Sequence, residues 1–187
     1  DREAACSALE IFLVQRSWPQ LRPRINLLWA GGMAVLDDVR DSTRLAALGY
    51  VKVLSDQILR ACDPAESPQE RVIECAGIML PVLMDRGLVA PTPEGRGVAL
   101  GLLVRIIKAA KNMLEPWLPR LVSVLVEAMS ALEPQTLQYM SFHTARLHIS
   151  EEELEQKRLQ LSQHSPMQEA LDGCLNSLSR GNLPETV

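Results

Sequence analysis

The chain has 187 residues, of which 47% are apolar and only 4% aromatic, and its formal net charge at pH 7 is −4. A chain of this length can bury a sizeable core, and a core of Leu, Val and Ala favours packed helices over a β-sandwich. The negative charge argues against nucleic acid as the main partner, because phosphate binding needs a basic face. We find no signal peptide and no apolar run long enough for membrane insertion. Because the first residue is Asp1 rather than Met, we expect a piece of a longer protein.

Neither the cysteines nor the histidines are spaced for a metal site or a disulfide framework. The cysteines form no CxxC pair and each lies in an apolar helical context, so we expect buried, reduced thiols in a cytosolic or nuclear protein. His143 and His148 are five residues apart, which does not place them on one face of a helix. We therefore expect no metal and no cofactor. The four cysteines are Cys6, Cys62, Cys75 and Cys174, and the third histidine is His164.

Apolar residues recur at helical spacing, and start signals divide the chain into helices. Ser67-Pro68-Gln69-Glu70 has the pattern of a capping box with proline at the first helical position. Asp41 is expected to cap its helix. No segment has the pattern of a strand. The predicted helices span 2–15, 23–36, 41–62, 67–84 and 92–114, and further helices begin at Pro116, Pro134 and Pro166.

Short connections between these helices predict antiparallel hairpins, and therefore an all-α fold, a HEAT-like α-solenoid. Each hairpin of a solenoid buries its apolar face against its neighbours, so the remainder of the same solenoid is itself a partner. We expect one solenoid segment over residues 1–187. Its hairpins span about 20–62, 67–114 and 116–147, followed by a charged linker over 148–165 and a terminal helix over 166–179.

The linker is the most polar part of the chain. It contains Glu151-Glu152-Glu153, and Glu153 and Lys157 have the spacing of a favourable pair on one helix face. We predict a protruding or mobile charged helix between repeats. The alternative is a helix that lies on a partner.

The run Asp37-Asp38-Val39-Arg40-Asp41-Ser42-Thr43-Arg44 has the pattern of the turn inside a HEAT hairpin. Acidic residues close the turn, and we expect Asp37, Asp38 and Arg44 to tie stacked repeats together. Arg96 holds the corresponding place in the second hairpin. A metal or acid–base role for the acidic pair is the weaker interpretation, because capping the positive end of a helix explains it.

Two prolines are predicted to shape the first helices of the later hairpins. Pro81 and Pro119 lie in the middle of these segments, where a proline kinks a helix, as HEAT first helices commonly show. The first hairpin has no such proline. Gly31-Gly32 is expected to serve there as a bend or as a close helix contact.

The three tryptophans stand out because aromatic residues are scarce. The first interpretation makes Trp18, Trp29 and Trp117 wedges in the core or between repeats. The second makes Trp18 and Trp117 exposed anchors for a partner, since tryptophan is enriched at binding hot spots. One modest basic cluster surrounds Trp18 and is expected to be a solvated rim rather than an anion site: Arg16, Arg22 and Arg24.

No residue constellation typical of an enzyme is present. No serine or cysteine has a nucleophile elbow, and no glycine-rich loop follows a strand. We therefore assign no catalytic residue and expect a surface for other proteins rather than a catalyst.

Several blocks in order over about residues 35–178 carry a family resemblance: 37–47, 62–65, 80–87, 132–139, 165–169 and 174–175. They resemble the large HEAT-repeat proteasome adaptor and scaffold proteins found across eukaryotes. The resemblance implies a non-enzymatic solenoid that binds the 26S proteasome and tethers or checks its core particle and regulatory ATPase particle. It also implies a place in the C-terminal half of such a protein. The implied localisation is cytoplasmic and nuclear, with partners linking it to endosomes or the endoplasmic reticulum.

The alternative is a transport or cytoskeletal solenoid, such as a tubulin-binding array or an import receptor. Tubulin-binding arrays need basic residues along the hairpin turns. The turns of this chain instead carry Asp37, Asp38, Asp85, Glu94 and Glu133, which disfavours that class.

Overall fold

The computed structural model describes residues 1–130 and 166–181, and within these ranges every regular element is a helix. This agrees with the predicted all-α class. The chain divides into two compact units, Asp1–Met113 and Leu114–Val187. The helix predicted from Pro134, the third hairpin beyond residue 130 and the charged linker lie outside the described residues. None of the described helices is long and apolar enough to cross a membrane.

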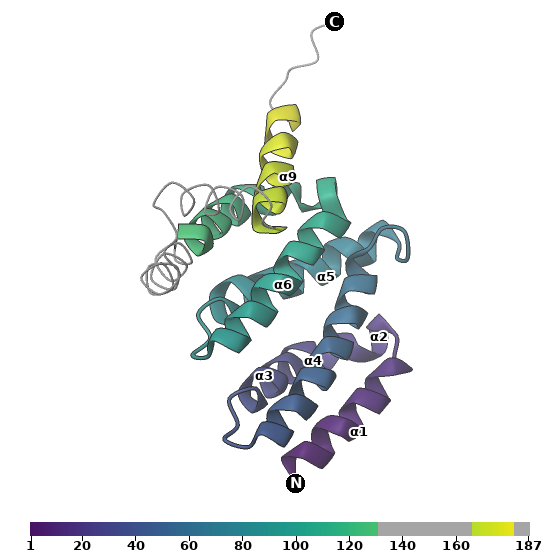
Figure 1. The fold of residues 1–187 in the computed structure, drawn as a ribbon. Helices are drawn as coiled ribbons and strands as arrows, with labels where there is room; N and C mark the ends of the chain where they lie inside the picture. Colours follow the sequence, from purple (N-terminus) through teal and green to yellow (C-terminus); the bar gives the residue numbers. More distant parts are fainter. Residues whose placement is uncertain (131–165, 182–187) are drawn as a thin grey trace, which may run out of the picture. The chain divides into compact units, whose positions relative to one another are not determined.

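Unit 1, residues 1–113, is built from two layers of helices (Figure 1). One layer, the α4 layer, contains α1, α4 and α6 side by side, and the other, the α3 layer, contains the short elements before α3, then α3 and α5. The α4 layer spans α1 (Arg2–Val14), α4 (Asp41–Cys62) and α6 (Pro93–Ala110). The α3 layer spans α2 (Trp18–Leu21), the 3₁₀ helix η1 (Arg22–Arg24), α3 (Ile25–Val35), α5 (Gln69–Val82) and the π-helix η2 (Leu83–Gly87).

Local signals explain where some helices begin. The backbone N–H of Gly95 donates to the Thr92 hydroxyl at 3.2 Å, and Pro93 occupies the first helical position of α6, as predicted. The second helical stretch begins at Trp18, earlier than the predicted Pro23. The Ser17 N–H donates to the Gln20 side chain at 3.1 Å, and a proline is tolerated in a first turn.

The predicted capping box at Ser67 is wrong. α5 begins at Gln69 after Pro68, and no side chain caps it. The Ser67 hydroxyl donates instead to the carbonyl oxygen of Arg60 at 2.9 Å. The last carbonyls of α4 lack partners within their own helix, and the loop brings the serine to one of them.

The core of unit 1 lies between the two layers and contains Trp29, Tyr50, Leu54, Met79 and Leu103, each no more than 2% exposed. α3 approaches α4 closely at Gly32. A Cβ atom added there would lie 2.6 Å from Cγ2 of Val51 and 2.9 Å from Cε1 of Tyr50. Of the two predicted roles for the glycine pair, the structure therefore gives Gly32 the close contact.

Unit 2, described by residues 114–130 and 166–181, is also helical. The 3₁₀ helix η3 (Lys111–Trp117) begins in unit 1 and leads into the α-helical residues 118–130. Pro119 lies in the first turn of these residues rather than in the middle of a helix, so it breaks no interior hydrogen bond there. Helix α9 (Pro166–Gly181) begins at Pro166, as predicted. The buried residues are Leu114, Leu118, Leu121, Leu125, Ala170, Leu171 and Cys174.

Candidate interaction surface

Arginines hold the two turns that lead into α4 and α6. Nη1 of Arg44 donates to the carbonyl oxygens of Asp38 at 2.8 Å and Val39 at 3.4 Å. Nη1 of Arg96 donates to the carbonyl oxygens of Ala90 at 2.8 Å and Pro91 at 3.1 Å. The two arginines therefore occupy equivalent positions, as the alignment of the two turns predicted.

The predicted tie between stacked helices comes from Asp38 rather than from Arg44. The hydrogen bonds of Arg44 lie within its own turn, as does its ion pair with Asp41, which is the first residue of α4 and not its cap. Asp38 accepts from the backbone N–H of Arg40 at 3.0 Å and from Nη1 of Arg2, on α1, at 2.7 Å. These hydrogen bonds, the one from Arg40 first, hold the pKa of the Asp38 carboxyl below its ordinary value.

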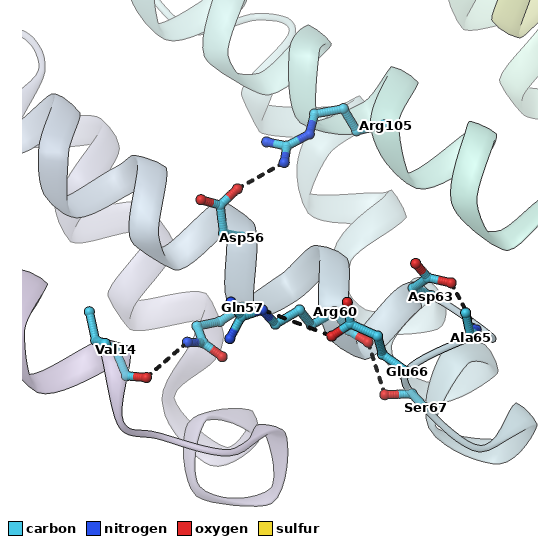
Figure 2. A network of polar contacts seen from close by, with 9 residues as sticks. All are labelled: Val14, Asp56, Gln57, Arg60, Asp63, Ala65, Glu66, Ser67 and Arg105. Carbon is cyan, nitrogen blue, oxygen red and sulfur yellow. Dashed lines mark hydrogen bonds and ion pairs between the residues drawn. The ribbon is translucent and has the colours of Figure 1, made fainter.

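A second set of polar contacts, which the sequence analysis missed, joins α4 to both of its neighbours in the layer (Figure 2). Nη2 of Arg105, on α6, donates to Asp56 at 2.8 Å, and the Gln57 side chain donates to the carbonyl oxygen of Val14 at 3.4 Å. Asp56 and Arg105 are 41% and 48% exposed, so this ion pair contributes little stability.

Trp18 is buried, so the prediction of an exposed anchor is wrong for this residue. Its side chain is 6% exposed, and Nε1–H donates to Oε2 of Glu74, on α5, at 3.0 Å. The other carboxylate oxygen of Glu74 lies 3.0 Å from Nε of Arg22. The Trp18 ring, at the start of α2, therefore packs as a wedge between α2 and α5. Trp117 is half-buried, and its role as an anchor stays a prediction.

The surface of unit 1 is hollowed between α3 and α5. One hollow of about 610 Å³ is lined by Ala30, Met33 and Ala34 of α3, by Pro81 and Val82 of α5, and by Asp37, Asp85 and Arg86. A second hollow of about 460 Å³ is lined by Trp18, Arg22, Arg71, Glu74 and Ile78. Asn26 lines both, so we describe them together as the α3–α5 groove.

Comparisons with known proteins identify the family. The model of the HEAT-repeat domain of proteasome adapter and scaffold protein ECM29 matches residues 114–187. The human proteasome adapter and scaffold protein ECM29 is 35% identical over 190 aligned residues, which cover 100% of this chain. The chain belongs to the ECM29 family. Proteasome component ECM29 of Saccharomyces cerevisiae is 24% identical over 94% of the chain, and proteasome component ecm29 of Schizosaccharomyces pombe is 20% identical over 98%.

The family resemblance found in the sequence is thereby confirmed, and with it the HEAT-repeat class of the fold. This chain spans only 10% of the length of the human ECM29 protein, 10% of the S. cerevisiae protein and 11% of the S. pombe protein. No solved structure matches it significantly.

The cysteines of this ECM29-family chain are buried and free, as predicted. A hydrogen bond with Cys62, together with burial, raises the pKa of the Cys75 thiol far above its ordinary value. Such a thiol stays protonated and is a poor nucleophile. Among the described residues, no group of His, Cys, Asp or Glu side chains could hold a metal ion.

Proposed function

We propose that this chain is a scaffold segment that helps its parent protein bind the 26S proteasome. The observation that carries the proposal is the 35% identity to the human proteasome adapter and scaffold protein over the whole chain. In this proposal the parent protein tethers or checks the core particle and the regulatory ATPase particle. It acts without catalysis, in the cytoplasm and the nucleus.

The arrangement of unit 1 suits a scaffold. In the α4 layer, hydrogen bonds join α1 to α4 and the turn before it near both ends, between Arg2 and Asp38 at one end and between Gln57 and Val14 at the other. Hairpins that contact only their neighbours form an extended array, and such arrays expose long surfaces to partners. No observation on the described residues favours the transport or cytoskeletal alternative.

The test is affinity purification of the tagged parent protein with and without residues 1–187, with proteasome subunits counted by mass spectrometry. We expect subunits with the intact protein and a clear loss without the segment. A deletion of similar length at one end of the parent solenoid is the control for general damage. Equal recovery with and without residues 1–187 would remove this segment from proteasome binding. No recovery from the intact protein would overturn the proposed function.

A further inference from the structure

Helix α3 has the composition of a buried helix but lies at the surface. Its 11 residues, Ile25–Val35, include no charged side chain. Even so, Ala30, Gly31 and Ala34 are exposed, and Leu27 is 74% exposed. A surface helix normally carries charged residues on its outer face, and a helix that is apolar all round is normally covered. The outer face of α3 therefore lacks the charged residues that a solvent-facing helix normally carries.

The α3–α5 groove runs along the side of α3 that carries Asn26, Ala30 and Ala34. Its larger hollow, about 610 Å³, has the size of ligand pockets in proteins, and small and apolar residues form its walls. Ala30 and Ala34 stand on one side, and Pro81 and Val82 on the other. The wall continues into η2, a π-helical turn, and such turns are frequent at functional sites.

The two ends of the groove carry opposite charge. At the end where α3 and α5 begin lie Arg22 and Arg71, together with Glu74, whose carboxylate already binds Trp18 and Arg22. At the other end Asp37 and Asp85 outnumber Arg86. The groove is therefore basic at one end and acidic at the other.

This polarity opposes the stability of α3 itself. A helix is stabilised by acidic residues near its N-terminus and basic residues near its C-terminus. α3 has the reverse arrangement, since Arg22 and Arg24 precede it and Asp37 and Asp38 follow it, and it has no acidic residue in its first turn. Asp38 and Arg22 have partners within unit 1, since Asp38 accepts from Arg2 and Arg22 pairs with Glu74. Asp37 lines the groove and is exposed at the C-terminal end of α3.

Further repeats of the same solenoid do not account for the groove. Repeats stack in a line, and each contacts only its neighbours along that line. α3 and α5 belong to consecutive hairpins that already stack on each other, so the groove between them is not the face on which a further repeat stacks. Another repeat would add to an end of the stack rather than fill this groove.

We propose that the α3–α5 groove binds an amphipathic helix of a partner protein. The small residues Ala30 and Ala34 let the apolar face of that helix approach closely, as in other helix-in-groove contacts. An acidic side chain at one end of the helix lies beside Arg71, and a basic side chain at the other end lies beside Asp37. The proposal rests on the proposed function, because it assigns the helix to a proteasome subunit.

The test measures binding of the full-length parent protein to purified 26S proteasome. Ala34→Arg fills the groove, and arginine is a good helix former, so α3 is expected to stay folded. Ala65→Arg is the matched control, because Ala65 is exposed in the loop after α4, outside the groove. We expect Ala34→Arg to weaken binding roughly tenfold or more and Ala65→Arg to leave it unchanged. Thermal melting of each variant checks the fold.

Charge reversal gives a second, independent measurement. Asp37→Arg and Arg71→Glu are each expected to weaken binding several-fold.

A photo-crosslinker at position 34 should capture one proteasome segment that is acidic at one end and basic at the other. Unchanged binding of all three variants, with the unmodified protein still bound to the proteasome, would overturn the groove and keep the proposed function. Absence of binding by the unmodified protein would overturn both.

Discussion

Arg44 and Arg96 make the same contact in successive turns: each guanidinium donates from Nη1 to a carbonyl oxygen six residues earlier, at 2.8 Å in both. The two turns have little sequence in common, since the first carries Asp37 and Asp38 and the second Val89 and Ala90. What the turns share is a pair of backbone carbonyls that point at the arginine. The arginine therefore recognises backbone, and acidic side chains are not required at the turn.

Replacing either arginine should destabilise the fold. Arg44→Ala leaves the carbonyl oxygens of Asp38 and Val39 without their donor, and Arg96→Ala does the same at Ala90 and Pro91. A hydrogen bond to a charged group contributes about 1.5–3 kcal/mol, and we expect the lower end because Arg44 is 40% exposed. Chemical denaturation measures the change. Lys52→Ala, at an exposed residue inside α4, is the control, and equal stability of all three variants would contradict the contact's role.

The sequence predicted what is decided locally and missed what depends on distant neighbours. Thr92 and Pro166 start their helices as predicted, because the start signal and the helix are adjacent in the chain. The burial of Trp18 depends on Glu74, which no local pattern pairs with it. The α3–α5 groove likewise requires two helices to lie together. The sequence does show that α3 has no charged residue. A helix without charges is also expected in a core, however, and only the arrangement of the two layers shows that α3 lies at the surface.

The glycine pair of α3 provides a matched test of close packing. Gly32→Ala should destabilise by about 1–3 kcal/mol, because the new Cβ would lie 2.6 Å from Val51 and 2.9 Å from Tyr50, both fully buried. Gly31→Ala should stabilise by up to about 1 kcal/mol, since nothing lies within 4 Å and alanine favours a helix. Denaturant midpoints of the two variants should therefore move in opposite directions. A shift of the same sign would contradict the close approach of α3 to α4.

The Asp38 carboxyl should make stability depend on pH under acidic conditions. Its pKa in the folded protein lies below the ordinary value of 3.8, because Arg40 and Arg2 donate to the charged form. Its contribution is therefore present above pH 3.8 and is lost as the pH falls through the lower folded value. Melting temperatures of the unmodified protein and Asp38→Asn should differ at neutral pH and converge in acid. A difference that persists at the lowest pH would mean that ionisation of Asp38 is not the cause.

Lys111 ends α6 with a positive φ of 46°, a conformation that side chains other than glycine rarely adopt. Lys111→Gly should therefore stabilise the protein by about 1 kcal/mol, because glycine reaches this conformation without strain. Lys52→Gly is the matched control, since Lys52 is exposed inside α4, where glycine costs about 1 kcal/mol. Thermal melting should raise the midpoint for the first variant and lower it for the second. A lower midpoint for Lys111→Gly would show that the lysine side chain stabilises the turn by more than its backbone costs.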